Sequence, residues 1–519
     1  MKRTNYSFLF LIFMLFVLSV SSCKDEWTAH YSEASGIKSD LNLYDYMKSQ
    51  KDLSIFTKLV KVAGYDTILS KSQTYTIWAP KDSVLTGITI VDTVKFVENH
   101  IARFSHPTSD LSAETIFMID SKLISFARTG ASFTFGGMLL DKNKSNIATR
   151  NGIIHYINNF VPYLPNIWEF IGSTTGLDSL RKYLYSNNKL TFNLAASGQD
   201  IGTNANGQLL YDSVFTLSNK ILNNIGQLNI EDSIYTAILP DNNAWNIAYA
   251  KIKPYFNTFG VETLKQRDYI QYSLVQDLIF RKPAIDPTSL DSIVSTSNSV
   301  FHRPDSLFMG TTKHSVSNGS VYVSSGLNHK STESWNKEIR IEAETDYFGR
   351  FTSNANLYPK SSSGSGLSVS LNKYILVNNL TTNTTSACFV TFPIPNTLST
   401  KYNIYCVFVP TSIVDKNDLR PSRADFYLTS LSAAGKSVTK KITFAPKKNE
   451  TDPTKITKMF VTQVQFPYCN IVDFTDFKTT SISVSLRIQN TVTMDEANLA
   501  KNPYNRDMLI DCIILEPVQ

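Results

Sequence analysis

The sequence contains little cysteine and little charge. Only five cysteines occur in 519 residues, and no two of them are spaced as Cys-x-x-Cys. This spacing excludes a zinc ribbon and a thioredoxin-like redox motif. Charged residues make up 18% of the chain, below the roughly 25% of typical soluble domains. The net charge of +6 is spread along the chain, which argues against a dedicated nucleic-acid-binding protein, because such proteins concentrate their basic residues.

Motifs of common catalytic sites are also missing. The chain has no His-Glu-x-x-His, no Gly-x-x-x-x-Gly-Lys and no Gly-x-Ser-x-Gly sequence, and its seven histidines do not cluster at metal-ligand spacing. We therefore expect a binding protein and not an enzyme. A hydrolase that uses carboxylates from distant loops is the alternative that a single sequence leaves open.

Long hydrophobic runs are absent apart from one near the start. Lys2 and Arg3 precede an apolar run over residues 8–20, which is shorter than the roughly 20 residues that a membrane-spanning helix needs. A charged start, a short apolar segment and small residues after it are typical of a secretory signal peptide. We predict a signal peptide over residues 1–22.

The residues after this run resemble two known export signals. Val20-Ser21-Ser22-Cys23 resembles a bacterial lipobox, which implies that Cys23 is lipidated and becomes the mature N-terminus. Lys24-Asp25-Glu26 resembles the export signal of Bacteroidota surface lipoproteins. The two resemblances imply a lipid-anchored tether over residues 23–37 on the outer face of the outer membrane. An ordinary signal peptide with an incidental cysteine is the alternative.

Two segments of the chain occur twice. Residues 75–85 are similar to residues 235–245, and residues 151–157 are similar to residues 318–323. The first pair places β-forming residues before a proline and a polar helix cap, which predicts a strand, a turn and a helix. The second pair places Asn-Gly before a short β-branched and aromatic strand, as in a hairpin. The offsets of 160 and 167 residues indicate a repeat of domain size.

The first copy resembles a fasciclin (FAS1) domain. The residues that carry the resemblance are the helix over residues 53–60, the Tyr75 to Leu85 box, Asn99-His100-Ile101 and the strand over residues 151–157. We expect a fasciclin domain over residues 38–165. Fasciclin domains serve adhesion and binding and have no catalytic group.

A second, degenerate fasciclin-like domain is expected over residues 166–329. Its first helix is expected from Trp168 to Leu184. Ser273 and Tyr322 are expected at the places of His100 and His155. We interpret His100 and His155 as buried side chains that the backbone satisfies, and ligand contact is the alternative.

The character of the sequence changes after about Trp335. Strands rich in Ser and Thr alternate with polar turns, which predicts a β-sandwich over residues 335–519. Residues 340–344 and 509–517 are expected to be neighbouring first and last strands. This pattern is similar to carbohydrate-binding jelly rolls of the galactose-binding-like class. The expected fold is therefore multidomain, α+β and then all-β. The other strands are expected over residues 366–370, 386–392, 402–409, 426–428, 458–466 and 481–488.

The jelly-roll resemblance implies two sites. In such domains, acidic residues of the first strand and an Asp of the last strand hold a structural calcium ion, and here these are Glu342, Glu344 and Asp511. Two solvated glutamates on an edge strand are the alternative. Sugar contact is expected from the loop aromatics Tyr347, Phe348 and Tyr358, which could instead cover the edge of the core.

The four cysteines after Cys23 all lie in the expected sandwich. In an exported protein they could form two disulfides. We expect buried thiols instead, because three of them lie in apolar strand runs, where cysteine packs as a small core residue. The four are Cys388, Cys406, Cys469 and Cys512.

Together these features predict a non-catalytic surface lipoprotein that binds a glycan or another polymer. The resemblances imply a nutrient-uptake setting, beside a TonB-dependent transporter and its lipoprotein lid. Fasciclin-mediated adhesion to host matrix or to neighbouring cells is an alternative of a different class. A structural subunit that docks on the transporter is a third.

Overall fold

The computed structural model describes residues 37–518, apart from residues 110, 199, 204–208, 212–213, 261–262, 282–285, 348, 382–386, 473–482 and 499–502. The chain divides into two compact units. The first takes the chain up to Ser173 together with Gln227–Tyr235 and Ser315–Ser320, and the second takes Thr174–Gly226, Thr236–His314 and Val321–Gln519. Each helix that the structure describes is too short or too polar to span a bilayer.

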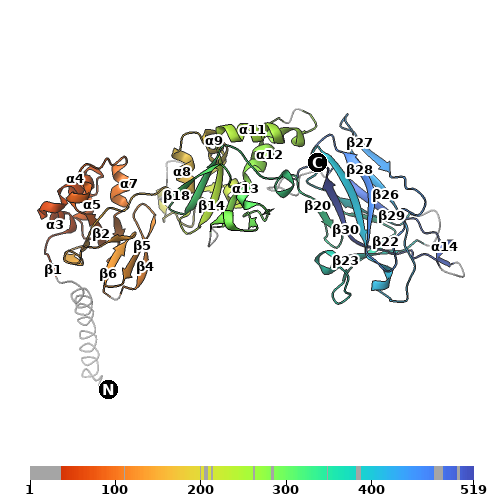
Figure 1. The fold of residues 1–519 in the computed structure, drawn as a ribbon, viewed down its shortest axis with the longest axis horizontal. Coiled ribbons are helices and arrows are strands. Elements are labelled where there is room, and N and C mark those ends of the chain that lie inside the picture. Colours follow the sequence, from red (N-terminus) through yellow and green to blue (C-terminus); the bar gives the residue numbers. More distant parts are fainter. Residues whose placement is uncertain are drawn as a thin grey trace, which may run out of the picture. The chain divides into compact units, whose positions relative to one another are not determined.

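Residues 37–162 form a mixed five-stranded sheet with short helices and an antiparallel four-stranded sheet (Figure 1). The strand orders are β1-β8-β9-β2-β3 and β4-β5-β6-β7. The strands are β1 (Ile37–Lys38), β2 (Tyr75–Pro80), β3 (Ile101–Arg103), β4 (Ala113–Phe117), β5 (Leu123–Thr129), β6 (Ser132–Phe135), β7 (Met138–Leu139), β8 (Ile147–Thr149) and β9 (Gly152–Ile157). The helices are α3 (Leu43–Ser49), α4 (Ser54–Val62), α5 (Asp66–Leu69), α6 (Asp82–Leu85) and α7 (Thr93–Glu98).

Strand β2 is buried on both faces and joins two hydrophobic clusters. Ile77 and Ala79 pack with the helix residues Phe56 and Val60. Trp78 points to the opposite face, because successive side chains of a strand alternate, and it stacks on Phe135 of β6 with ring centroids 4.2 Å apart. The predicted strand, turn and helix after Tyr75 and the predicted helix over residues 53–60 are confirmed.

The Asn-Gly pair before β9 ties the helices to the sheet. The Asn151 side chain accepts a hydrogen bond from the Leu43 amide (2.8 Å) and donates one to the Leu69 carbonyl (2.9 Å). Gly152 has φ +154°, and a Cβ at this position would lie 1.9 Å from the Tyr75 carbonyl oxygen. Only glycine fits where two backbones approach this closely.

The second sheet repeats this arrangement at the predicted positions. Its strand order is β15-β14-β19-β18. The Asn318 side chain accepts a hydrogen bond from the Ile167 amide (2.8 Å) and donates one to the Leu228 carbonyl (2.9 Å). A Cβ on Gly319 would lie 1.8 Å from the Tyr235 carbonyl oxygen. Asn318-Gly319 therefore performs the same task as Asn151-Gly152.

Two details of the second sheet differ from the expectation. The helix expected from Trp168 to Leu184 is two helices, α8 and α9, because the chain turns at Gly176 (φ +85°). Ser273 lies inside helix α12 and does not take the place of His100. That place belongs to Leu278, whose carbonyl accepts from the Ile238 amide (2.9 Å), as the His100 carbonyl accepts from the Trp78 amide (3.0 Å).

Residues 167–324 contain the second sheet together with helices and further short strands. The helices are α8 (Ile167–Ser173), α9 (Asp178–Ser186), α10 (Lys220–Ile225), α11 (Asn242–Ile252), α12 (Thr263–Val275) and α13 (Pro304–Leu307). The strands are β10 (Asn188–Phe192), β11 (Asp200–Thr203), β12 (Leu209–Tyr211), β13 (Phe215–Asn219), β14 (Tyr235–Pro240), β15 (Ile279–Arg281), β16 (Ile293–Val294), β17 (Val300–Phe301), β18 (Thr311–Val316) and β19 (Gly319–Ser324).

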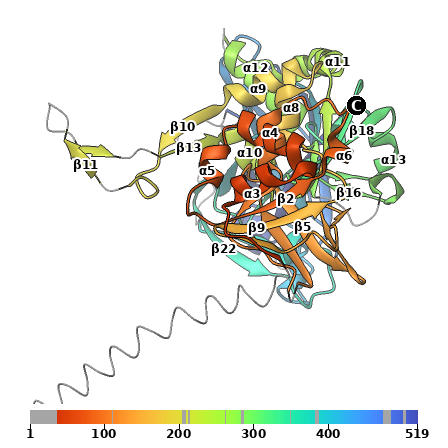
Figure 2. The ribbon, with the colours of Figure 1, turned by 90° about the vertical axis from the view of Figure 1, so that its left-hand side faces the viewer.

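A two-stranded ribbon of β10 and β13 lies between α9 and α10 in the chain, and β11 lies beyond it (Figure 2). The register pairs Leu190 with Leu217 and Phe192 with Phe215. Cross-strand partners and alternate residues share a face, so these four side chains form one apolar face. All four are exposed, Leu190 to 68%.

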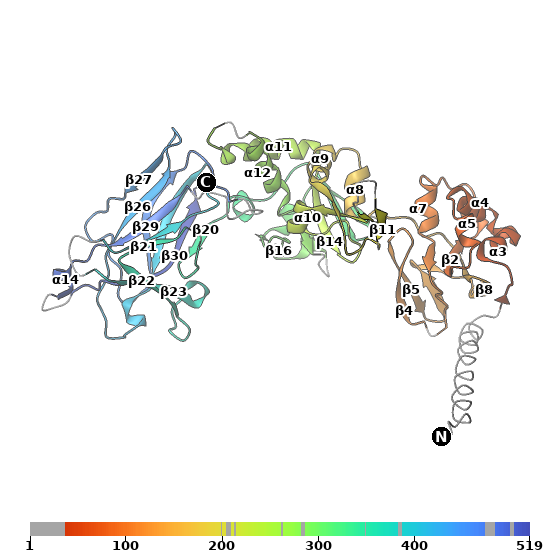
Figure 3. The ribbon, with the colours of Figure 1, turned by 180° about the vertical axis from the view of Figure 1, so that it is seen from behind.

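The C-terminal part consists of two antiparallel sheets (Figures 1 and 3). Phe408 of one sheet and Phe426 of the other pack edge to face, 6.4 Å apart. The six-stranded sheet has β22 (Ala355–Ser361), β23 (Lys373–Asn379), β30 (Met508–Pro517), β25 (Lys401–Phe408) and β28 (Thr457–Gln465), with β20 (Ile339–Glu342) on β30. The five-stranded sheet has β21 (Phe351–Ser353), β24 (Phe389–Pro393), β29 (Ser485–Asn490), β26 (Ala424–Leu431) and β27 (Ser437–Lys441). A short helix, α14 (Met494–Asn498), precedes β30.

The first and last strands are neighbours, as predicted, because β20 pairs with β30 antiparallel. One predicted strand is wrong. Residues 366–369 form a loop and not a strand, and Ser370 begins a short 3-10 helix, because Gly364 and Gly366 adopt positive φ angles of 82° and 74°. The strands expected from residues 386 and 481 begin later, at Phe389 and Ser485.

Candidate functional site

An acidic cluster forms where β20 meets β30. Glu342 lies opposite Cys512 in the register, and Asp511 precedes Cys512. The Ser370 amide donates to both carboxylate oxygens of Asp511 (3.1 and 3.3 Å), and the Ser370 hydroxyl donates to Oε1 of Glu342 (2.7 Å). Ser370 therefore holds the two carboxylates side by side. The loop over residues 366–370, which the sequence did not predict, supplies this residue.

The cluster has more negative charge than the protein neutralises. Asp511 is only 3% exposed, and burial raises the pKa of its carboxyl to about 6, with a further contribution from Glu342 and Glu344. Oε2 of Glu342 and Oε2 of Glu344 are buried and have no hydrogen-bond partner. A buried acceptor without a partner costs about 1–3 kcal/mol. The site therefore has unused oxygen ligands for a cation.

The structure brings together two of the three predicted calcium ligands. Ligand atoms of Glu342, Asp511 and Cys512 lie within 4.8 Å of one another. Glu344 follows the end of β20 and lies outside this group. Cys512 is a poor third ligand, because burial raises the pKa of its thiol to about 12, and metals bind the thiolate. The carboxylates fit a hard cation such as calcium, which takes oxygen ligands.

We expect calcium to stabilise the purified chain at pH 7.5 and to have little effect at pH 5. Because the pKa of Asp511 is about 6 in the fold and about 4 in the unfolded chain, the metal-free stability falls as the pH rises between these values. A bound cation removes this penalty only where the carboxylate is charged. At a concentration a hundredfold above its dissociation constant, calcium would add about 2.7 kcal/mol to the free energy of unfolding.

Thermal unfolding with calcium and with a chelator, at both pH values, measures this effect. Asp511→Asn should lose the calcium shift, whereas Asp495→Asn, on the exposed side of α14, should keep it. An equal shift in the Asp511 variant would contradict a calcium site at this cluster.

Two of the predicted sugar-contacting aromatics lie on different elements of the sandwich. Tyr347 is half-buried in the loop after β20, and Phe348 lies outside the described residues. Tyr358 was expected in this loop but lies in the edge strand β22, where it is 44% exposed and pairs in register with Leu376. None of the hydrogen bonds or ring contacts of the described residues joins Tyr347 to Tyr358. The predicted sugar contact of these aromatics therefore stays a prediction.

A different surface of the C-terminal part carries aromatic and polar side chains together. On the five-stranded sheet, Arg487 of β29 pairs in register with Thr391 of β24 and with Tyr427 of β26. The neighbouring register row contains Phe389, Gln489 and Asp425. We call these six residues the Arg487 face; all are partly exposed. The residues that alternate with them, such as Val390, Phe426 and Ile488, are buried.

This face was not predicted from the sequence, because the strand predictions did not assign the outward side of each strand. The alternation Phe389-Val390-Thr391 and Asp425-Phe426-Tyr427 was a usable signal. It marks half-buried strands with one apolar and one mixed side. Only the cross-strand register puts the three mixed sides next to one another.

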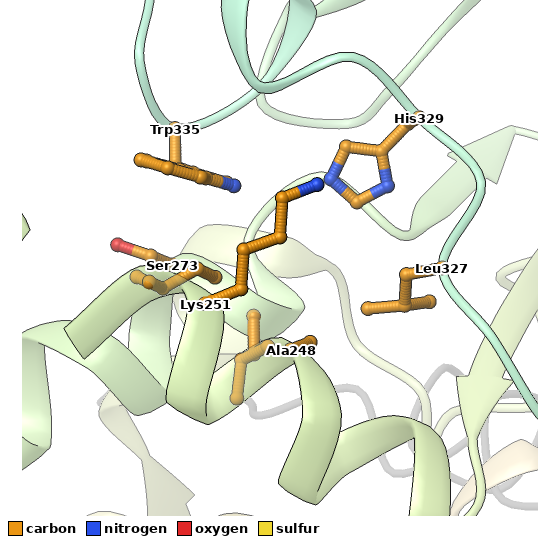
Figure 4. A pocket seen from close by; sticks show the side chains of 8 residues that line it. Ala248, Lys251, Ser273, Leu327, His329 and Trp335 are labelled. Atoms are coloured by element: carbon orange, nitrogen blue, oxygen red, sulfur yellow. The ribbon is translucent and has the colours of Figure 1, made fainter. Parts of the chain in front are cut away.

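The structure also contains a small pocket beside α11 and α12 (Figure 4). The Lys251 side chain extends toward the His329 ring, with Trp335 on the other side. Burial lowers the pKa of His329 to about 4, so its ring is neutral at pH 7. The pocket measures about 20 Å³, which is room for about one water molecule. It is lined by Ala248, Lys251, Ile252, Ser273, Leu274, Leu327, His329 and Trp335.

The remaining sequence candidates are structural or lie outside the described residues. His100 and His155 are fully buried, and each bonds to backbone groups through both ring nitrogens, as interpreted. Cys388, Cys406 and Cys512 are buried free thiols, as expected, and Cys469 is partly exposed. Cys23, Lys24, Asp25 and Glu26 lie outside the described residues.

Comparison with known proteins identifies one family. Residues 51–162 match the family model of the fasciclin domain, so this part of the chain is a fasciclin domain. No curated protein matches the chain.

The chain is also similar to solved structures. One is the CBM22-1–GH10 module pair of a Clostridium thermocellum xylanase with xylohexaose (13% identity, TM-score 0.22, 36% of this chain and 29% of that chain). Another is the CBM22-1 xylan-binding domain from Paenibacillus barcinonensis (11%, 0.21, 35% and 94%). A third is a FAS1 domain pair from the insect cell adhesion molecule fasciclin I (13%, 0.20, 54% and 98%). With such low TM-scores, these likenesses carry no argument about function.

Proposed function

We propose that this protein is a non-catalytic surface lipoprotein that binds a glycan polymer through its C-terminal β-sandwich. The observation that carries the proposal is the Arg487 face. It combines two aromatic rings, Phe389 and Tyr427, with the hydrogen-bonding side chains of Thr391, Asp425 and Gln489 on three paired strands. An open, rigid face of this kind suits an extended polymer better than a small ligand.

The chemistry of the face matches that of a sugar chain. The apolar C–H side of a sugar ring packs on aromatic and other apolar surfaces, and its hydroxyls need hydrogen-bond donors and acceptors. Side chains on paired strands hold their positions better than side chains on loops. The cation cluster would support the sandwich from a distance, by joining the first strand to the last.

We expect Tyr427→Ala to weaken glycan binding by about tenfold, equivalent to about 1.4 kcal/mol, because it removes one of the two aromatic rings of the face. Affinity electrophoresis of the full chain through gels that contain plant and host polysaccharides measures the effect. Tyr358→Ala is the matched control, since Tyr358 is an exposed tyrosine of the same part of the chain on a different sheet. Loss of binding in the Tyr358 variant alone would instead support the site expected from the sequence.

We place this function at the outer face of the outer membrane. The basis is the lipobox-like sequence up to Cys23 and the Lys24-Asp25-Glu26 signal. There the protein would gather a polymer beside a TonB-dependent transporter and its lipoprotein lid. Membrane fractionation and surface proteolysis of cells that carry Cys23→Ser test the anchor. Co-purification with an outer-membrane transporter separates this role from that of a purely structural subunit.

Adhesion is the second candidate function, and the fasciclin match over residues 51–162 favours it. A second fasciclin-type domain over residues 166–329 would extend the adhesive region, and the shared Asn-Gly arrangement supports that assignment. Binding of the full chain to immobilised matrix proteins distinguishes adhesion from glycan capture. Adhesion would persist in Tyr427→Ala, whereas glycan capture would not.

A further inference from the structure

The Arg487 face contains an arginine that the protein holds in place but does not neutralise. The guanidinium carbon lies 3.9 Å from the ring centroid of Phe389 and 4.5 Å from that of Tyr427. Two aromatic rings therefore cover this group, which is weakly hydrated for a cation. Such contacts fix the orientation of the guanidinium and leave its edge as the place for hydrogen bonds.

The hydrogen bonds at this edge are incomplete. Nη2 of Arg487 donates to Oε1 of Gln489, and among the described residues Nη1 has no hydrogen-bond acceptor. Nε is buried without a partner, so a ligand would bind at the Nη end of the edge. Among the described residues, no carboxylate lies within ion-pair distance of Arg487. Asp425, the acid of the same face, pairs with Lys441 at 2.6 Å. By contrast, four other arginines of this part of the chain pair with a carboxylate: Arg340, Arg350, Arg420 and Arg423.

From this geometry we infer that the face selects an acidic polysaccharide, whose uronate carboxylate binds the edge of the Arg487 guanidinium. This inference rests on the proposed glycan-binding function and names the class of glycan. A planar guanidinium matches a planar carboxylate, and a charge-assisted pair of this kind is about twice as strong as a neutral hydrogen bond. Thr391, the register partner of Arg487 on β24, and Gln489, two residues further along β29, are placed to bind sugar hydroxyls.

Charge complementarity supports an anionic occupant over a neutral one. With Asp425 and Lys441 paired, Arg487 is the cation of the face without an acidic partner. A neutral sugar would leave this cation, already weakly hydrated between two rings, without a counter-charge. An anionic sugar supplies the missing charge, and the positive site speeds its association at low ionic strength.

The test compares each acidic polymer with its own neutral form. Polygalacturonate, alginate and hyaluronan are offered to the full chain beside the same polymers with their carboxyls reduced to alcohols. We expect at least one acidic polymer to bind about tenfold or more tightly than its reduced form, as loss of a charged hydrogen bond predicts. We expect Arg487→Gln to abolish this preference. Arg487→Lys should retain only part of it, because lysine keeps the positive charge but lacks the paired N–H donors of the planar guanidinium.

Lys440→Gln is the matched control. Lys440 lies on β27 next to Lys441 but has the opposite strand parity, so its side chain belongs to the other side of the sheet. The Lys440→Gln substitution removes one positive charge, as Arg487→Gln does. It should leave the preference for the acidic polymer over its reduced form unchanged. Dextran sulfate distinguishes a carboxylate site from a general anion site, and stronger binding of dextran sulfate than of every uronate would overturn the inference.

The possible outcomes separate the two proposals. If the chain binds the reduced polymers as tightly as the acidic ones, the inference fails and the glycan-binding function stands. If it retains no polysaccharide of either kind, the glycan-binding function fails. If Arg487→Gln does not fold, the unmodified chain and the Arg487→Lys variant still test the inference. Equal binding of the acidic and the reduced polymer by the unmodified chain would overturn it.

Discussion

Replacing Lys122 with methionine is expected to lower the free energy of unfolding of the first unit by about 3–5 kcal/mol, the usual cost of removing one partner of a buried ion pair. Lys122 lies between β4 and β5, and its side chain is 4% exposed. Its Nζ lies 2.6 Å from Oε2 of Glu169 and 2.7 Å from Oε1 of Glu231. Without the lysine, two carboxylates remain together, one of them buried.

The location of these residues gives the prediction a specific readout. Glu169 lies on α8, and Glu231 lies in the segment before β14, so one ammonium joins three separate parts of the first unit. Urea unfolding followed by hydrogen exchange of peptides from residues 37–162 measures the loss.

Two further variants control this experiment. Lys58→Met, on the exposed side of α4, should change stability by less than about 0.5 kcal/mol. Adding Glu169→Gln and Glu231→Gln to Lys122→Met should restore part of the loss, because it removes the unpaired charge. A loss below about 1 kcal/mol would show that solvent, and not Lys122, neutralises the two glutamates.

The fasciclin domain is expected to lose stability as the pH falls from about 6.5 to about 4. His100 and His155 are fully buried, and burial lowers the pKa of each to about 4, whereas an unfolded histidine has a pKa near 6.5. Between these values the unfolded chain binds more protons than the folded chain. The free energy of unfolding therefore falls with pH in this window and is constant above it. Each histidine contributes up to roughly 3 kcal/mol.

Asp120 opposes this trend over part of the range. Burial raises the pKa of its carboxyl to about 6, so its contribution to stability falls as the pH rises from about 4 to about 6. Because two histidines oppose one carboxyl group, the free energy of unfolding should still fall as the pH falls.

His155→Tyr is the informative variant, because tyrosine stands at the related position, Tyr322, in the second sheet. It should remove close to one proton from the slope of stability against pH. An unchanged slope in urea titrations from pH 7.5 to 4.5 would show that His155 does not titrate on unfolding. Trp78→Phe, which alters the ring stacked 5.8 Å from His155 and adds no titrating group, should keep the slope.

Local chemistry explains why parts of the fold could be predicted. The strand, turn and helix after Tyr75 and after Tyr235 follow from β-forming residues, a proline and a polar cap within eleven residues. Each Asn-Gly pair marks the start of a strand, because only glycine fits the close backbone approach at Gly152 and at Gly319. The expected position of Ser273 was wrong because it was inferred by counting along a degenerate repeat, where only the hydrogen bond from Ile238 to Leu278 shows the true correspondence.

The candidate sites were harder to predict because they depend on residues far apart in the chain. Glu342 and Asp511 could be paired in advance, since the first and last strands were expected to be neighbours. Ser370, which bonds to both, could not, because it lies in a loop that resembled a strand. The Arg487 face needs three strands in one register, and Phe389, Tyr427 and Arg487 are separated by dozens of residues.

The cysteine spacing of this sequence by itself excludes a zinc ribbon and a thioredoxin-like redox motif. Its small and evenly spread net charge argues against a dedicated nucleic-acid-binding protein. Short motifs determined a fasciclin domain and the repeat, because each motif encodes its structure within a few neighbouring residues. The export route stays a prediction. The tertiary structure alone decided which acids share a site and which side of a sheet is open. Those properties come from cross-strand register and burial, which long-range pairing sets and a local pattern does not contain.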